Sequence, residues 1–150
     1  MNDDWFDMLA ALLDAEVRFL VVGAHALAVH GHPRATQDID IWIDPARENA
    51  RRVWGAMSAF GAPMHDLDVT EADLSTLGLV VQVGLPPNRI DLLTAITGVP
   101  DFDAAFEQRV TRPVRGRDIP FIGRDALLQN KRSTGRTKDV ADAELLEGEE

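Results

Sequence analysis

The sequence of 150 residues contains no cysteine, which excludes disulfide bonds and thiol chemistry. It also lacks any apolar run near the roughly 18 residues that a membrane-spanning helix needs. The first residues, Met-Asn-Asp-Asp, are acidic and therefore do not resemble a secretory signal peptide. From these absences we expect a cytoplasmic protein without a membrane partner.

The charge of the chain is negative overall but unevenly distributed. The net charge of −10 argues against unspecific adhesion to nucleic acid. Residues 1–108 carry a net charge of −11, residues 109–138 carry +7, and residues 139–150 carry −6. The basic block 109–138 therefore indicates a local site for an anion, and an ordinary solvated surface patch is the alternative.

The pattern of apolar residues predicts a single domain, residues 1–150, of mixed α/β class, and 45% hydrophobic content is enough for a buried core. The predicted helices are 4–15, 24–29, 45–60, 101–108 and a C-terminal helical part, about 124–147, that is divided near 133–136. The predicted strands are 17–22, 38–43, 79–83, 89–93 and a hairpin over 114–122 that turns at 115–118. Asp44 is predicted to cap its helix, with Pro45 as the first helical residue, which leaves Asp44 out of any metal site.

Acidic and apolar residues alternate along 38–44, which reads Asp-Ile-Asp-Ile-Trp-Ile-Asp. In a strand this period directs Asp38 and Asp40 to one face and the isoleucines to the other. The Cα atoms of the two aspartates would lie about 7 Å apart, because a strand rises ~3.3 Å per residue. Carboxylates at that spacing repel each other, and a divalent cation removes the repulsion. The alternative is an edge strand with a solvated acidic face, although acids are poor strand formers.

A third acid, Asp91, is flanked by aliphatic residues in the predicted strand 89–93. If this strand lies beside the one that carries Asp38 and Asp40, three carboxylates converge and can hold two cations for an in-line displacement at phosphorus. The alternative is an ordinary ion pair between Asp91 and Arg89 on the same strand face. The sequence leaves both interpretations open.

A glycine separates the buried strand 17–22 from the short helix after it. Gly23 lets the backbone approach a ligand closely, and the N–H groups of a helix start can bind a phosphate; the alternative is a glycine that only ends the strand. Arg34 and Thr36 precede the acidic strand, where a guanidinium and a hydroxyl group can reach triphosphate oxygens. The histidines do not have zinc-ligand spacing, but we expect His25 or His32 to line a nucleotide pocket.

Two segments carry motifs in a recognisable order. The first runs Gly23-Ala24-His25-Ala26-Leu27, then Arg34-Ala35-Thr36-Gln37-Asp38-Ile39-Asp40-Ile41, and the second, 131–142, follows the pattern Lys-x-x-x-x-Arg-x-Lys-Asp-x-x-Asp. These motifs resemble those of the nucleotidyltransferase superfamily with the polymerase β fold, and AbiEii-like and related small bacterial nucleotidyltransferases most of all. The resemblance spans about residues 5 to 146 and implies a mixed central sheet flanked by helices.

The resemblance also implies a metal site. Asp38 and Asp40 would bind a pair of Mg²⁺ ions, for which Mn²⁺ can substitute. Asp91 would complete the site, as a base for the attacking hydroxyl group or as a further metal ligand.

Phosphate contacts follow from the same resemblance. Gly23 and the Ala24 amide would hold the β- or γ-phosphate of a nucleoside triphosphate (NTP), and Lys131 would contact the triphosphate or the acceptor. The basic block 109–138 would bind phosphates of the acceptor. Ala24 departs from the family, in which glycine or serine is usual at this position.

The implied activity is Mg²⁺-dependent transfer of a nucleoside monophosphate from an NTP such as ATP to a hydroxyl group. The acceptor would be RNA, for example a tRNA end, or a protein, as for toxins of toxin–antitoxin pairs, in which case a cognate antitoxin is expected. The alternative is a catalytically inactive nucleotide- or partner-binding module of the same fold. Ala24 favours that alternative, because it lacks the serine hydroxyl group and its methyl group crowds a phosphate.

Overall fold

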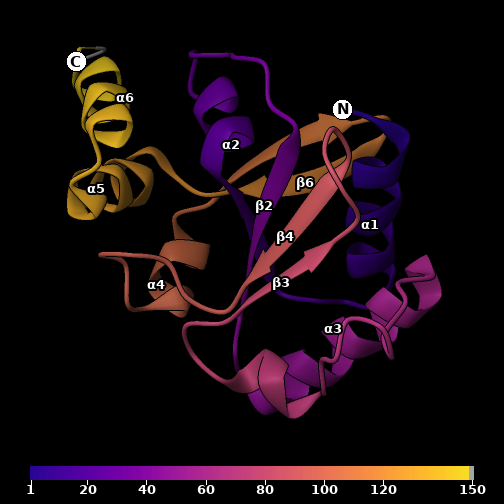
Figure 1. Cartoon of the computed structure of the whole chain (residues 1–150). Helices are drawn as coiled ribbons and strands as arrows, with labels where there is room; N and C mark the ends of the chain where they lie inside the picture. Colours follow the sequence, from indigo (N-terminus) through magenta and orange to yellow (C-terminus); the bar gives the residue numbers. More distant parts are fainter. Residues whose placement is uncertain (149–150) are drawn as a thin grey trace.

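In the computed structural model, which describes residues 1–148, six strands form one mixed sheet in the order β3-β4-β2-β1-β6-β5 (Figure 1). The strands are β1 (Phe19–Val22), β2 (Asp38–Ile43), β3 (Val80–Val83), β4 (Arg89–Leu93), β5 (Val110–Val114) and β6 (Arg117–Phe121). The helices are α1 (Asp3–Asp14), α2 (Gly23–Val29), α3 (Arg47–Phe60), the 3-10 helix η1 (Ala72–Ser75), α4 (Phe102–Glu107), α5 (Arg124–Thr134) and α6 (Thr137–Glu147). Mixed α/β architecture is therefore confirmed.

The middle of the sheet brings distant segments together. β2 pairs antiparallel with β1 and parallel with β4, and β1 pairs parallel with β6. The outer strands β3 and β5 pair antiparallel with β4 and β6. The parallel pairing of β2 with β4 is the feature that positions the candidate site.

Each face of the sheet packs against its own set of helices. Along β2, Ile39, Ile41 and Ile43 belong to a core on the side of α1 and α3, whereas Trp42 belongs to a second core with residues of α2, α4, α5 and α6 (Figure 1). The side chains along 38–43 thus alternate between the two faces of the sheet, as the sequence predicts. Asp38 and Asp40 share the face of Trp42. No helix within residues 1–148 is both long and apolar enough to cross a bilayer.

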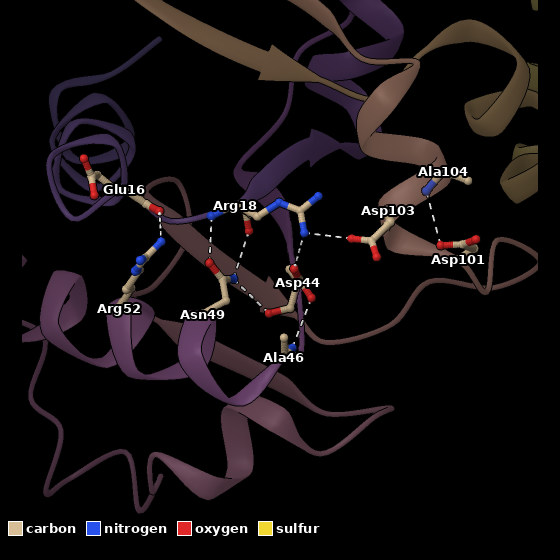
Figure 2. A network of polar contacts seen from close by, with 9 residues as sticks. All are labelled: Glu16, Arg18, Asp44, Ala46, Asn49, Arg52, Asp101, Asp103 and Ala104. Atoms are coloured by element: carbon tan, nitrogen blue, oxygen red, sulfur yellow. Dashed lines mark hydrogen bonds and ion pairs between the residues drawn. The ribbon is translucent and has the colours of Figure 1, made fainter.

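The predicted start of the third helix is wrong. α3 begins at Arg47, and Ala46, with φ −57° and ψ 143°, is its N-cap. The carboxylate of Asp44 instead accepts hydrogen bonds from the Ala46 N–H at 3.0 Å and from Arg18 Nη1 at 2.7 Å (Figure 2). Because Arg18 and Ala46 take up both oxygens of Asp44, residues 44–46 stay outside the helix.

The C-terminal hairpin is longer and tighter than predicted. β5 begins at Val110 rather than Val114, and only Arg115 and Gly116 connect it to β6. Both residues have positive φ values, 49° and 82°, as a two-residue turn between antiparallel strands requires. The positions of the other predicted helices and strands are confirmed to within about two residues at each end, which is the usual uncertainty of element boundaries.

Candidate active site

Three carboxylates meet on the α4–α6 side of the sheet. In the parallel β2–β4 register, Asp40 lies opposite Asp91, and Asp38 lies opposite Arg89. Asp91 is buried, with 6% exposure, and Asp38 and Asp40 are half-buried. The predicted convergence of the two acidic segments is therefore confirmed, because adjacent residues of paired strands project side by side.

Arg89 lies between two of these carboxylates. Its Nη2 donates to Asp38 Oδ2 at 2.8 Å and to Asp91 Oδ2 at 3.2 Å, and its Nε lies 3.2 Å from Asp91 Oδ1. The last contact is an ion pair without hydrogen-bond alignment, so the buried Asp91 Oδ1 has no hydrogen-bond partner among the described residues. Both interpretations of Asp91 thus hold at once: it joins the acidic cluster, and it pairs with Arg89.

The carboxylates carry more negative charge than Arg89 neutralises. Burial first, and then the neighbouring charges of Asp38 and Asp91, raise the pKa of Asp40 to about 7, against a smaller opposing effect of Arg89. Three carboxylates with one guanidinium are short of positive charge. A cation that supplied this charge would favour the ionised form of Asp40.

Gly23 makes room for Asp40. Its φ is +67°, and a Cβ atom at this position would lie 2.5 Å from Asp40 Oδ2, which is closer than nonbonded atoms can approach. Val22, the preceding residue, pairs with Asp40 across β1 and β2. Packing against Asp40 is therefore sufficient to explain why glycine stands between β1 and α2.

A cavity of about 750 Å³ opens beside the carboxylates. One wall comes from the N-terminal half of the chain and includes Gly23, Ala24, Arg34, Thr36, Asp38 and Asp40. The other wall comes from α5 and α6 and includes Asn130, Lys131, Thr134, Arg136, Lys138, Asp139 and Asp142. Seven of the nine predicted site residues line this cleft, and Asp91 and His25 do not.

His25 faces away from the cleft. Its ring packs edge-on against Trp5 of α1, with 4.8 Å between ring centroids, and burial lowers the pKa of its imidazole. The helical rotation of about 100° per residue explains this position, since His25 lies two residues beyond Gly23 on α2. The expectation that His25 lines the pocket is not met.

Lys131 forms ion pairs with two aspartates of α6. It is only 9% exposed, and its Nζ lies 3.1 Å from Asp139 Oδ1 and 3.3 Å from Asp142 Oδ2. Asp142 also accepts a hydrogen bond from Arg34 Nη2, which ties the loop before β2 to α6. Burial acts to raise the pKa of Asp139, but hydrogen bonds from Thr134 and Lys131 outweigh it and lower that pKa below its usual value. Lys131 and Arg34 therefore hold the wall of the cleft together.

Thr36 and Lys138 complete the polar lining. The Thr36 hydroxyl group donates to the Asp38 carbonyl oxygen at 3.0 Å, so it shapes the start of β2. Lys138 is exposed, lines the cleft and forms no ion pair with residues 1–148. Lys138 is the second lysine of the motif in 131–142, and that motif is the sequence signal for it.

The basic block 109–138 does not form one surface. At the tip of the β5–β6 hairpin, Arg115 pairs with Asp3 and Arg117 pairs with Asp14, each at 2.8 Å, so this end lies against α1. Lys131, Arg136 and Lys138 instead line the cleft. Only the α5–α6 part of the block is in a position to meet a ligand of the cleft.

The donor chemistry of the carboxylate cluster fits a divalent cation of the magnesium type. Such ions take carboxylate oxygens, and Asp91 Oδ1 is a buried oxygen without a hydrogen bond. The geometry is not that of a ready metal site, since no three His, Asp or Glu side chains within residues 1–148 are arranged to hold an ion. Arg89 lies between Asp38 and Asp91 and pairs with both of them.

Comparison with known proteins identifies the fold. No family model and no curated protein matches the sequence. The structure is similar to the crystal structure of the lincosamide antibiotic adenylyltransferase LnuA bound to lincomycin, with a TM-score of 0.62 and 15% sequence identity. The match covers 98% of this chain and 96% of that one. The chain therefore has a nucleotidyltransferase-like fold, as the sequence motifs predict.

Proposed function

We propose that the protein is a Mg²⁺-dependent nucleotidyltransferase that moves a nucleoside monophosphate from an NTP to a hydroxyl group. The observation that carries this proposal is the meeting of Asp38, Asp40 and Asp91 beside a large polar cleft in a nucleotidyltransferase-like fold. In the reaction, the hydroxyl oxygen forms a bond to the α-phosphorus, and the bond from that phosphorus to the β-phosphate oxygen breaks. Pyrophosphate leaves, and the hydroxyl proton passes to a base.

Each carboxylate has a role in this scheme. Asp38 and Asp40 would hold the cations, and Asp91 would act as a further ligand or as the base. Bound Mg²⁺ would neutralise charge on the triphosphate and the attacking oxygen. The protein itself orients the carboxylates, through the β2–β4 pairing and the space left by Gly23.

The rest of the cleft suits a triphosphate. Gly23 and Ala24 line it next to Asp40, and Lys138 offers a cation without an acidic partner in residues 1–148. We therefore assign the phosphates to the region between the start of α2 and Lys138. Lys131, which the sequence motif suggests for this role, would act by fixing the position of α6. ATP is the first nucleotide to test, because the structural neighbour is an adenylyltransferase.

Label transfer tests the proposal directly. The protein is incubated with each of the four α-³²P-labelled NTPs, Mg²⁺ and a set of acceptors, and labelled products are separated. We expect transfer from at least one NTP, and none with Asp40→Asn. The matched control is Asp73→Asn, because Asp73 is a half-buried acid outside the cleft whose carboxylate accepts from the Thr70 N–H at η1. Absence of label with every NTP and acceptor would contradict the proposal.

The acceptor set includes tRNA, cellular protein and small hydroxylated molecules. RNA and protein follow from the AbiEii-like resemblance, and small molecules follow from LnuA, whose substrate class is a lincosamide antibiotic. For an RNA acceptor, Lys138→Ala would reduce transfer, whereas Arg115→Ala would not, because Arg115 pairs with Asp3 on α1. If the protein is a toxin, its expression arrests growth, and co-expression of a cognate antitoxin restores growth.

An inactive binding module is the second candidate. Two observations favour it: Ala24 in place of glycine or serine, and Arg89 in the position of a cation. Calorimetry separates the two candidates. Tight NTP binding that does not change with Mg²⁺ or in Asp38→Asn, together with no label transfer, would identify the module.

A further inference from the structure

Arg89 provides positive charge where the carboxylate cluster lacks it. It lies on β4, two residues before Asp91 and directly opposite Asp38 on β2. Its guanidinium bridges the two carboxylates through contacts of 2.8 and 3.2 Å. These are the oxygens that a divalent cation would need, so the cation and the guanidinium compete for the same ligands.

The contact between Arg89 and Asp91 falls short of a pair of good hydrogen bonds. Arg89 faces both oxygens of Asp91 at 3.2 Å, through Nη2 to Oδ2 and Nε to Oδ1, but only the first contact is a hydrogen bond. Nε and Oδ1 are buried and neither forms a hydrogen bond in the part of the chain that the structure describes. A planar guanidinium can bind one carboxylate with two parallel hydrogen bonds, but here Nη2 is shared between Asp38 and Asp91. Asp91 Oδ1 is therefore paired by charge alone, which leaves it able to accept a stronger ligand.

The Arg89 side chain also has a route out of the cluster. The side chains of Arg89 and Asp38 are 30% and 31% exposed, whereas the side chain of Asp91 is only 9% exposed. The side chain of Arg89 therefore reaches the solvent boundary, and a rotation about its χ angles would carry the guanidinium from the cluster toward solvent. The carboxylates stay in place, because their strands are paired over five residues.

We propose that Arg89 is the resident counter-ion of the carboxylate cluster and that a divalent cation must displace it to bind. This inference rests on the proposed function, which requires the metal. Contact of the guanidinium with the carboxylates and binding of the metal are then mutually exclusive, because two positive groups in contact with the same oxygens repel each other. Arg89 stabilises the metal-free protein and weakens metal binding.

Metal titration tests the inference without any activity measurement. Binding of Mn²⁺ to the full chain is followed from the electron paramagnetic resonance signal of the free ion at pH 8.5. We expect Arg89→Ala to bind Mn²⁺ at least about tenfold more tightly than the wild type, because the competing charge is gone. Arg89→Lys should lie between the two, since it keeps the charge but not the fork of donors. Arg52→Ala is the matched control, because Arg52 pairs with the exposed Glu48 on α3.

A second measurement uses the wild-type protein and does not depend on the folding of a variant. The ¹⁵N-labelled Nε–H signal of Arg89 is recorded while diamagnetic Mg²⁺ is added. Displacement predicts that this signal moves toward that of a free guanidinium as the site fills. An unchanged signal at saturation would overturn the inference.

The outcomes separate this inference from the proposed function. If the wild type binds Mn²⁺ and Arg89→Ala binds it equally or more weakly, Arg89 is not a competitor, and only the inference is wrong. If the wild type and all variants fail to bind Mn²⁺, the metal site does not exist, and the proposed function and the inference are both wrong.

Discussion

Two clusters of carboxylates face the same cleft, and they differ in how well nearby cations neutralise them. The sheet cluster comprises Asp38, Asp40, Asp91 and the single cation Arg89. The helix cluster comprises Asp139, Asp142 and the three cations Arg34, Lys131 and Arg136. The sheet cluster therefore has an excess of negative charge, and the helix cluster does not.

The pKa values of the carboxylates show the consequence. The pKa of Asp40 rises to about 7 through burial and the charges of its acidic neighbours. Hydrogen bonds from Thr134 and Lys131 outweigh burial and lower the pKa of Asp139. The neutralised helix cluster holds α5, α6 and the loop before β2 together, whereas the sheet cluster, which is short of cations, is where we propose that one binds. The number of acidic residues does not distinguish the two clusters. The number of cationic side chains in contact with those acids does.

The largest expected effect comes from removing one charge of the sheet cluster. Asp40→Asn should reduce nucleotidyl transfer by about 10³-fold, because one ligand of the proposed metal site is lost. Thermal stability should stay the same or rise, since the repulsion from Asp38 and Asp91 disappears. Label transfer and thermal unfolding measure the two effects. Transfer by Asp40→Asn at the wild-type rate would show that Asp40 is not needed for the reaction. Loss of folding in this variant would show that Asp40 is structural, as the acids of the helix cluster are.

Removing the central cation of the helix cluster should have the opposite consequence. Lys131→Met leaves Asp139 and Asp142 buried with less compensation and should lower the free energy of unfolding by about 3–5 kcal/mol. Urea unfolding provides the measurement. The control is Lys138→Met, which changes an exposed lysine of the same wall and should stay within about 0.5 kcal/mol. Equal stability of the two variants would mean that the helix cluster is not structural.

The two clusters should also respond to pH in opposite directions. Because the folded-state pKa of Asp40 is raised from 3.8 to about 7, the folded protein binds more protons than the unfolded chain in this window. Metal-free protein should therefore lose stability as pH rises from about 4 to 7. Asp139, whose pKa is lowered, contributes stability that is lost as pH falls below its ordinary value.

Urea unfolding at pH 5 and pH 8 measures the first of these effects. The fall in stability between the two pH values should be smaller in Asp40→Asn than in the wild type, and Mg²⁺ should reduce it in the wild type alone. The same pH dependence in both proteins would show that Asp40 titrates normally.

A smaller effect is expected from a methyl group at the edge of the sheet cluster. Gly23→Ala places a Cβ atom 2.5 Å from Asp40 Oδ2 at a φ of +67°, and should destabilise the protein by about 1–3 kcal/mol. Transfer should fall as well, because Asp40 must move. Gly55→Ala is the matched control: it lies within α3 with no atom inside 4 Å, and should stabilise by about 0.5–1 kcal/mol. Unfolding of both variants in urea compares them, and a neutral Gly23→Ala would mean that Asp40 adapts freely.

Much of the sheet cluster could be predicted from the sequence. The alternation in 38–43 assigns Asp38 and Asp40 to one face, and the family resemblance adds Asp91 as their neighbour. Strand parity also offered an ion pair between Arg89 and Asp91, which the structure contains. The second contact of Arg89, with Asp38, could not be predicted, because it depends on the register between β2 and β4. The sequence thus identified the acids, and the structure shows what balances them.

Distant partners are what the local sequence does not reveal. Asp44 has the sequence context of a helix cap, but Arg18, 26 positions earlier, binds its carboxylate, and the predicted helix start is wrong. Arg34 lines the cleft, so its role as a phosphate ligand stays a prediction, but its pairing with Asp142, 108 positions later, was not predicted. Neither partner follows from local propensity, because both depend on how the helices pack against the sheet.

The Arg34–Asp142 pair joins a segment made early in translation to one made late. While the ribosome is still adding α6, the loop before β2 has no carboxylate to bind, and one wall of the cleft does not exist. The sheet carboxylates are by then already synthesised. A nascent chain therefore carries the carboxylates of the sheet cluster before both walls of the cleft exist, so the complete cleft can form only after α6 has been synthesised.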